Sequence, residues 1–372
     1  MGIPAYLIGQ AMLKSLLAFA LCAFALSVSN AQAQGFSLFN NAFAQDLPSK
    51  ASEAAGVETQ RRAQASLDRV PGPLPVVHTE GTLPGKGIRE ISSKAREDLP
   101  VMLNAALAYR MTGDRRYLAT AERFFEAWAN VYKPSFNPID ETHFDQVMLA
   151  YDLTRPDLSP TARGKLDAFW RAIALGYLDV MDGKPKNAET NWQSHRVKLA
   201  TMAAFQTGDA ALIQRAAKAY DRQIAANIHA DGSVFDFHER DALHYVTYGL
   251  DPLMMAALSA KAHGQDWFAR KNPAGAGLPT ALDWLAPYAK GDKVHQEFIN
   301  SKIQFDADRA ASGQKEYQPH PWDTANGAQT FGLARLLDPK YAPVFDNVVS
   351  RTGRAIPLWL TLYSATKNAG AN

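Results

Sequence analysis

Two segments near the middle of the chain combine side chains that could bind or transform a ligand. In the first, Asn191 and His195 are four residues apart, so on a helix they share one face. Burying an amide and an imidazole together requires hydrogen-bonding partners, and a bound ligand is one such partner. The alternative is a capped helix start whose polar side chains are satisfied within the protein.

The second segment covers residues 237–253. At about 100° per residue, one wedge of a helix would carry five polar side chains, namely Arg240, Asp241, His244, Tyr248 and Asp251. The pattern is typical of a surface helix, but histidine and tyrosine stand where solvated faces favour lysine and glutamate. Pro252 should disturb hydrogen bonding in the preceding turn and free backbone groups toward a cleft.

Other chemistries find less support in the sequence. It contains no glycine-rich phosphate loop and no GxSxG or HExxH motif. His295 with Glu297, and His238 with Glu239, could supply metal ligands, but neither pair has a tight metal-binding spacing. Tryptophans could stack on sugars, although core packing is their commoner role; they are Trp128, Trp170, Trp192, Trp284 and Trp322.

A helical apolar period begins at Glu97 and predicts the elements that hold these residues. Residues 103–128 are echoed by residues 198–224, and each copy contains a Thr-Gly-Asp turn. Glycine suits a helix end and aspartate caps the next helix, so the repeat predicts stacked helix pairs. We expect an all-α fold, an incomplete (α/α) toroid formed by one domain over residues 91–372, with residues 34–90 an extended, poorly ordered leader.

The first 33 residues have the pattern of a secretory signal peptide. Lys14 precedes the apolar run Leu16–Val28, and Ala31-Gln32-Ala33 provides a cleavage site. The run is too short to span a bilayer comfortably. Cys22 is the only cysteine, so cleavage leaves a chain without thiols. We therefore expect an exported protein, in the periplasm, without disulfides or cysteine nucleophiles and with no contact to the membrane after cleavage.

The composition is that of an ordinary globular protein, with 47% hydrophobic residues and a formal net charge of +2. It excludes a disordered, collagenous or coiled-coil chain. The 39 basic residues are nearly balanced by 37 acidic ones, which argues against nucleic acid as a partner.

Four stretches give the chain a likeness to the alginate lyase family of polysaccharide lyases, which fold as incomplete (α/α) toroids. They are LAYRMTGDRRYLATAERFFEAWA with Asn137-Pro138-Ile139, LAYDLTRPDLSP, ETNWQSH, and RDALHYVTYGLDPLMMAAL. Family members use an Asn-His pair, an Arg and a Tyr, and the resemblance implies Asn191, His195, Arg240 and Tyr248 as the counterparts. Two departures are visible: three residues separate Asn191 from His195, and Asp241 occupies the family's arginine position with Arg240 one residue before it.

The resemblance implies β-elimination on a 4-linked polyuronate, in which the C5 proton is removed and the 4-linked oxygen leaves. Asn191 and His195, the latter if protonated, would stabilise the sugar carboxylate and the enediolate that develops from it. Tyr248 would be the base and then the acid, with Arg240 the cation that favours its phenolate and His244 its orienting neighbour. The residues assigned to substrate binding are Trp192, Glu239, His244 and Tyr245.

Two alternatives remain open from the sequence. A glycoside hydrolase on a similar toroid would need two carboxylates at catalytic separation, and the available ones are Glu189, Asp236, Glu239 and Asp241. A non-catalytic glycan-binding protein of the cell envelope is the other. We expect a monomer acting on polymannuronate or glucuronan without a cofactor, and the question of a supporting metal ion stays open.

Overall fold

The computed structural model describes residues 35–366, so the predicted signal peptide lies outside the described residues. The helices are α2 (Asn41–Asp46), α3 (Ala54–Gln64), α4 (Ile88–Arg96), α5 (Asp98–Thr112), α6 (Arg115–Val131), α7 (Phe144–Thr154), α8 (Pro160–Asp182), α9 (Asn191–Thr207), α10 (Ala210–Asn227), α11 (Phe235–Arg240), α12 (Leu243–Ala262), α13 (Leu278–Lys290), α14 (Gln304–Ala311), α15 (Gly327–Leu337), α16 (Ala342–Thr352) and α17 (Leu358–Ser364). Two short antiparallel strands, β1 (Gln296–Glu297) and β2 (His320–Pro321), pair with each other. The all-α prediction is confirmed.

The two Thr-Gly-Asp turns join helices as predicted. Gly113 ends α5 with a φ of 72°, and Gly208 ends α9 with a φ of 68°, a left-handed conformation that favours glycine. Asp114 accepts a hydrogen bond from the main-chain N–H of Arg116 at 2.9 Å. Asp209 caps α10 in the same way, accepting from the N–H of Ala211 at 2.9 Å. The sequence repeat is therefore a repeat of helix hairpins.

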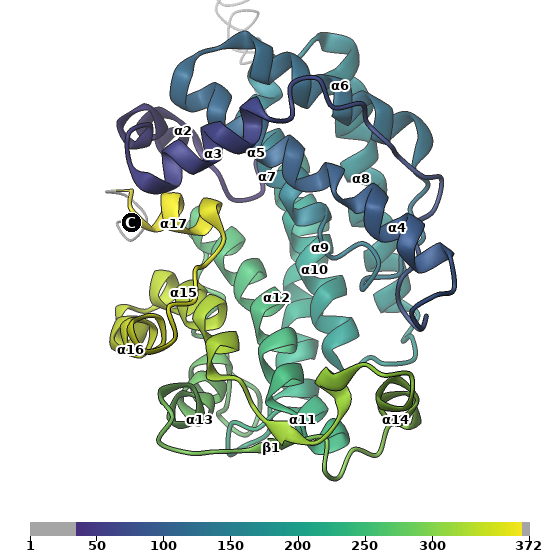
Figure 1. The fold of residues 1–372 in the computed structure, drawn as a ribbon, viewed down its shortest axis with the longest axis vertical. Helices are drawn as coiled ribbons and strands as arrows, with labels where there is room; N and C mark the ends of the chain where they lie inside the picture. Colours follow the sequence, from purple (N-terminus) through teal and green to yellow (C-terminus); the bar gives the residue numbers. More distant parts are fainter. Residues whose placement is uncertain (1–34, 367–372) are drawn as a thin grey trace, which may run out of the picture. The chain divides into compact units, whose positions relative to one another are not determined.

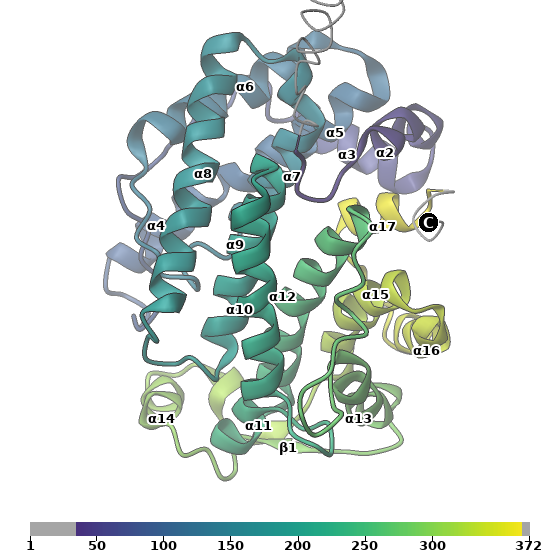
Figure 2. The same ribbon diagram turned by 180° about the vertical axis from the view of Figure 1, so that it is seen from behind.

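These hairpins form two layers, an inner row of helices and an outer layer that covers it. Helices α5, α7, α9, α12 and α15 pack successively against one another, and α9 and α12 lie side by side at the centre (Figure 1). Helices α6, α8 and α10 pack on the outside of this row, as the reverse view shows (Figure 2). Because α9 is covered by α7, α8, α10 and α12, nearly all its side chains are buried, including the polar ones at its start.

The segment 35–90 differs in part from the prediction of an extended, poorly ordered leader, because residues 41–64 are largely helical whereas residues 65–87 contain no helix or strand. It forms α2, α3 and the start of α4, and α3 packs on α5 and α17. Its apolar side chains enter the core, with Leu38, Phe39 and Phe43 almost fully buried. Because the segment is rich in Gln, Ala and Ser, its composition did not indicate this short apolar cluster. Burial of the cluster holds the segment against the rest of the protein.

A single carboxylate anchors the start of this segment. Asp152 of α7 accepts main-chain hydrogen bonds from Ser37 at 2.6 Å, Leu38 at 2.9 Å and Phe39 at 3.0 Å. The same carboxylate also accepts from the Ser37 hydroxyl and from the amide of Gln206. Burial raises the pKa of Asp152 to about 6, although these hydrogen bonds oppose that rise.

Replacing Asp152 with alanine should therefore destabilise the fold strongly. The substitution leaves several buried N–H donors without an acceptor, and each such group costs about 1–3 kcal/mol. We expect the free energy of unfolding in urea at pH 7 to fall by about 3–5 kcal/mol in total. A fall below about 1 kcal/mol would show that the anchor contributes little beyond the apolar packing.

None of the helices among residues 35–366 is long and apolar enough to cross a membrane.

Candidate active site

Tyr248 and His195 meet where α12 packs on α9. Their ring centroids are 4.4 Å apart and the rings are tilted by 52°. Both residues line a cavity of about 260 Å³ together with His143, Lys198 and Asp251. Tyr248 and Asp251 also line a larger hollow of about 1070 Å³, to which His244 contributes. The predicted base and the predicted histidine are thus brought together at the inner row of helices.

The surroundings of Tyr248 oppose its ionisation in the free protein. Burial raises the pKa of its phenol well above the ordinary value, and Tyr317 acts in the same direction. Two cations oppose this rise, Arg96 at the end of α4 and Arg309 on α14. The positive charge that favours a phenolate at Tyr248 therefore comes from helices distant in the sequence.

Arg240, expected to be that cation, is engaged elsewhere. Its guanidinium forms a close ion pair with the buried carboxylate of Asp306 and lies 4.0 Å from the ring centroid of Tyr245. Arg309 donates to the Tyr245 hydroxyl at 3.0 Å. These contacts join α14 to α11 and α12. Tyr245, expected to bind substrate, is held by Arg240 at its ring and by Arg309 at its hydroxyl, and only 5% of its surface is exposed.

The predicted polar stripe is also interrupted. Helix α11 ends at Arg240 because Asp241 adopts a left-handed conformation with a φ of 51°, and α12 begins at Leu243. The Asp241 carboxylate accepts from the main-chain N–H of Asn300 at 2.9 Å. Arg240 and Asp241 therefore belong to a different helix and a turn, and only His244, Tyr248 and Asp251 share the face of α12.

Pro252 lies inside α12 without ending the helix. Since proline has no N–H, the carbonyl of Tyr248, four residues earlier, loses its helical donor. The expectation that Pro252 frees a backbone group close to the cleft agrees with this geometry.

His195 is buried and held by one hydrogen bond. Its Nδ1 lies 2.7 Å from Oγ1 of Thr142, and only 3% of the residue is exposed. Burial lowers its pKa well below the ordinary value, and the charges of Lys198 and His143 act in the same direction. This lowered pKa favours the neutral imidazole over the protonated side chain that the sequence also allows.

Asn191 starts α9 one turn before His195 and is fixed by Asp236. Its amide nitrogen donates to Oδ1 of Asp236 at 2.6 Å, and its main-chain N–H donates to Oδ2 at 2.7 Å. Asn227 donates to the same Oδ2 at 3.3 Å. Burial raises the pKa of Asp236 to about 6, and the hydrogen bonds from Asn191 oppose that rise. One N–H and the carbonyl oxygen of the Asn191 amide remain for other partners.

Asn191 lines a second hollow of about 740 Å³ rather than the cavity at Tyr248. Trp192, Glu239 and Arg240 line the same hollow, together with Glu80. The Glu239 carboxylate pairs with Lys302 at 3.2 Å. The residues expected at one site thus lie in neighbouring hollows, one at Asn191 and the other at His195 and Tyr248.

His244 lies beside Tyr248, as expected of an orienting neighbour. The two rings are nearly parallel, at 8°, with centroids 6.1 Å apart. The main-chain N–H of His244 donates to Glu297 at 2.7 Å, so the start of α12 is capped from β1. Burial lowers the pKa of His244, and the positive charges of Arg240 and Arg309 lower it further.

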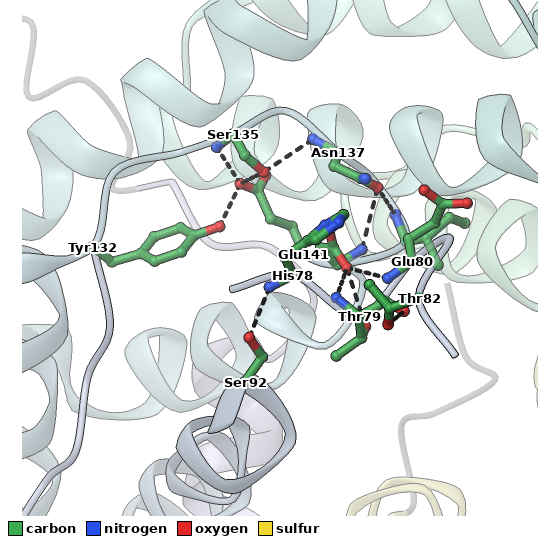
Figure 3. A network of polar contacts seen from close by, with 11 residues as sticks. His78, Thr79, Glu80, Thr82, Ser92, Tyr132, Ser135, Asn137 and Glu141 are labelled. Carbon is green, nitrogen blue, oxygen red and sulfur yellow. Dashed lines mark hydrogen bonds and ion pairs between the residues drawn. The ribbon is translucent and has the colours of Figure 1, made fainter. Parts of the chain in front are cut away.

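Sequence reasoning missed the segment that carries Thr142 and His143. A polar network holds it in place (Figure 3). Asp140 accepts from the main-chain N–H groups of Thr79 at 2.7 Å and Glu80 at 2.8 Å, which fastens the segment before α4.

The neighbouring carboxylate of Glu141 binds a different set of residues from Asp140. It accepts from the hydroxyl of Tyr132 at 2.5 Å, from the N–H of Ser135 at 2.6 Å, and from the hydroxyl of Tyr177 (Figure 3 shows the first two). Both carboxylates are at most 2% exposed. A pair of acidic residues directly after Asn137-Pro138-Ile139 was the available signal, because buried carboxylates usually hold a loop in a set position.

The helix hairpins have the (α/α)-toroid architecture, with Tyr248 and the buried His195 on its inner row of helices. A family model described as alginate lyase matches residues 40–295, and the chain belongs to that family. A polysaccharide lyase of Stenotrophomonas maltophilia (strain K279a) is 36% identical over 135 residues, which are 35% of this chain and 39% of that protein. The chain therefore matches well under two thirds of that relative's length.

Solved structures support the fold. An alginate lyase from Bacteroides ovatus matches with a TM-score of 0.63 and 16% identity, over 86% of this chain and 97% of that one. Alginate lyase A1-III from Sphingomonas species A1 matches with a TM-score of 0.53 and 18% identity, over 89% and 93%. A variant of A1-III complexed with a tetrasaccharide matches with a TM-score of 0.54 and 18% identity, over 83% and 90%.

Within residues 35–366 no group of three or more His, Cys, Asp or Glu side chains is arranged to hold a metal ion.

Proposed function

We propose that the protein is an exported polysaccharide lyase that cleaves a 4-linked polyuronate by β-elimination. The observation that carries the proposal is the pairing of Tyr248 with His195, 4.4 Å apart between ring centroids, in one cavity of the inner row. Membership of the alginate lyase family supports the same reaction class.

Tyr248 would act as base and then as acid. Its phenolate oxygen takes the C5 proton, the C5–H electron pair forms the C4–C5 double bond, and the bond from C4 to the linking oxygen breaks. The phenol then returns the proton to the leaving oxygen. Because burial opposes the phenolate, the reaction needs the positive charges of Arg96 and Arg309 and the proximity of a bound substrate.

His195 would stabilise the sugar carboxylate as charge develops on it, and Asn191 would donate to the same carboxylate from the neighbouring hollow, which requires the substrate to reach both. The Nε2 atom of His195 is buried without a hydrogen-bond partner among the described residues, so an acceptor on the substrate would complete its bonding. Asn191 has a free N–H because Asp236 occupies only one. Preorganised donors of this kind lower the barrier to an oxyanion-like transition state.

The substrate would be an anionic polymer, with polymannuronate and β-1,4-glucuronan the leading candidates, and the protein would act as a periplasmic monomer. The tetrasaccharide bound by an A1-III variant supports an oligosaccharide as ligand. Incubation of the mature protein with polymannuronate, polyguluronate, glucuronan, pectate and hyaluronan should raise the ultraviolet absorbance for one polymer or a few. New reducing ends without absorbance would instead indicate hydrolysis, and neither signal would favour glycan binding alone.

A further inference from the structure

The buried ammonium of Lys198 has an acceptor for each of its three protons. Its Nζ lies 2.6 Å from Oδ2 of Asp145, 2.7 Å from the main-chain carbonyl of Thr142 and 2.9 Å from the Thr142 hydroxyl. An ammonium only donates hydrogen bonds. Oγ1 of Thr142 is therefore an acceptor toward Lys198, and its own proton remains for another partner.

That partner is His195. Nδ1 of His195 lies 2.7 Å from Oγ1 of Thr142, and Thr142 is only 4% exposed. If Nδ1 carried a proton, both the imidazole and Lys198 would donate to this one oxygen, and the hydroxyl proton would be buried without an acceptor. Such an unpaired donor is costly. The consistent arrangement has the Thr142 hydroxyl donating to an unprotonated Nδ1.

We propose that Lys198 and Thr142 form a relay that locks His195 as the neutral tautomer with its proton on Nε2. The role of this relay in catalysis rests on the proposed function. In that reaction His195 would act as an uncharged N–H donor, not as an imidazolium. Thr142 and Lys198 are then positioning residues, which act on the substrate through His195.

The charges around His195 agree with a neutral ring. Burial disfavours a positive charge on His195 most strongly, and Lys198 on its own helix and His143 before α7 act in the same direction. From α7, Asp145 is paired with Lys198 at 2.6 Å. From α12, Tyr248 presents a phenol, and Asp251 accepts hydrogen bonds from side chains of α15 instead of from the histidine. Neither carboxylate is thus bonded to His195.

The opposite nitrogen is left available. Nε2 of His195 is buried and forms no hydrogen bond within the described part of the chain. The carbonyl of Tyr248, freed by Pro252, favours a proton on His195. A proton held on Nε2 therefore has the carbonyl of Tyr248 as a nearby acceptor, which supports the Nε2–H tautomer without forming a well-aligned hydrogen bond.

Nuclear magnetic resonance tests the tautomer directly. In the mature protein labelled with ¹⁵N at histidine, long-range ¹H–¹⁵N correlations identify the protonated nitrogen, and the spectrum of His195→Gln assigns the signals. We expect the Nε2–H tautomer throughout the range from about pH 8 to pH 5, which brackets the ordinary histidine pKa of about 6.5. A proton on Nδ1, or titration near the ordinary pKa, would overturn the relay.

Matched variants test the role of the hydroxyl. Thr142→Val removes the hydroxyl at nearly constant volume, and Thr142→Ser keeps it. We expect a mixture of tautomers or the Nδ1–H form in Thr142→Val, and the Nε2–H form in Thr142→Ser. If Thr142→Val fails to fold by circular dichroism, Lys198→Met provides the second test, since removing the ammonium frees the hydroxyl to accept from Nδ1. An unchanged tautomer in every folded variant that lacks the hydroxyl or the ammonium contradicts the proposal.

Turnover separates this proposal from the proposed function. If the uronan assay detects lyase activity, kcat/KM should fall at least tenfold in Thr142→Val and less in Thr142→Ser. If the protein shows the expected tautomer but no lyase activity, the proposed function is contradicted and the relay is supported. If the protein is an active lyase but His195 carries its proton on Nδ1, only the relay is contradicted.

Discussion

Replacing Tyr248 with phenylalanine should remove nearly all turnover while polymer binding stays measurable. The substitution deletes the only group proposed to move the proton, and such groups typically contribute about 10²- to 10⁴-fold to the rate. The ring remains beside His195, at a centroid distance of 4.4 Å in the wild type, so the cavity keeps its shape. Initial rates of unsaturated product and the binding of the polymer to the variant check both halves of the prediction.

Tyr220→Phe is the matched control. Tyr220 lies on α10 in the outer layer, and its buried hydroxyl has no hydrogen-bond partner among the described residues. Its removal should leave the rate close to that of the wild type. If Tyr248→Phe retains more than about a tenth of the wild-type rate, Tyr248 is not the base.

Asn191→Ala should lower kcat by about 10²- to 10³-fold, the range measured when one oxyanion donor is removed. The loss corresponds to about 2.7–4 kcal/mol of transition-state stabilisation. The main-chain N–H of Asn191 would still donate to Asp236, so the start of α9 should stay in place. Steady-state kinetics with thermal unfolding would separate a catalytic loss from a structural one.

Asn227→Ala provides the comparison for that experiment. Asn227 donates to the same carboxylate of Asp236, at 3.3 Å, and also to the main-chain carbonyl of Glu189 at 2.7 Å. It therefore supports the same cluster from inside the protein and should affect stability more than kcat. Equal losses of kcat in both variants would mean that Asn191 acts only by shaping the cluster.

The helix pairs could be predicted because their signals are local. Gly113 and Gly208 adopt the left-handed conformation that a helix end requires, and Asp114 and Asp209 cap the next helices. Tyr248 and His195 were also accessible, because the resemblance to the alginate lyase family pointed to them. Local spacing and periodicity therefore recover much of the scaffold.

The charges around the site could not be predicted in the same way. Arg96 and Arg309 reach Tyr248 from helices far away in the chain, whereas Arg240, the nearest arginine in the sequence, pairs with Asp306. Thr142 lies in an irregular segment fixed by hydrogen bonds to residues about 60 positions earlier, for which no period exists. Long-range electrostatic partners are set by tertiary packing and leave no local pattern.

Three of the four carboxylates considered for a hydrolase, Glu189, Asp236 and Glu239, line the hollow at Asn191. Asp236 is buried and hydrogen-bonded to Asn191, and Glu239 pairs with Lys302. A general acid and a base need carboxyl groups free to exchange protons with the sugar. These contacts therefore favour elimination at Tyr248 over hydrolysis by this carboxylate pair.

The masses of the products test the central claim most directly. Elimination adds no water, so each new non-reducing end carries a double bond and is lighter by one water than the hydrolysed end. For the polymer that the protein cleaves, we predict oligosaccharides of this lighter mass, which disappear with Tyr248→Phe and persist with Tyr220→Phe. Oligosaccharides with the full mass of hydrolysed ends would contradict β-elimination and the role of Tyr248 together.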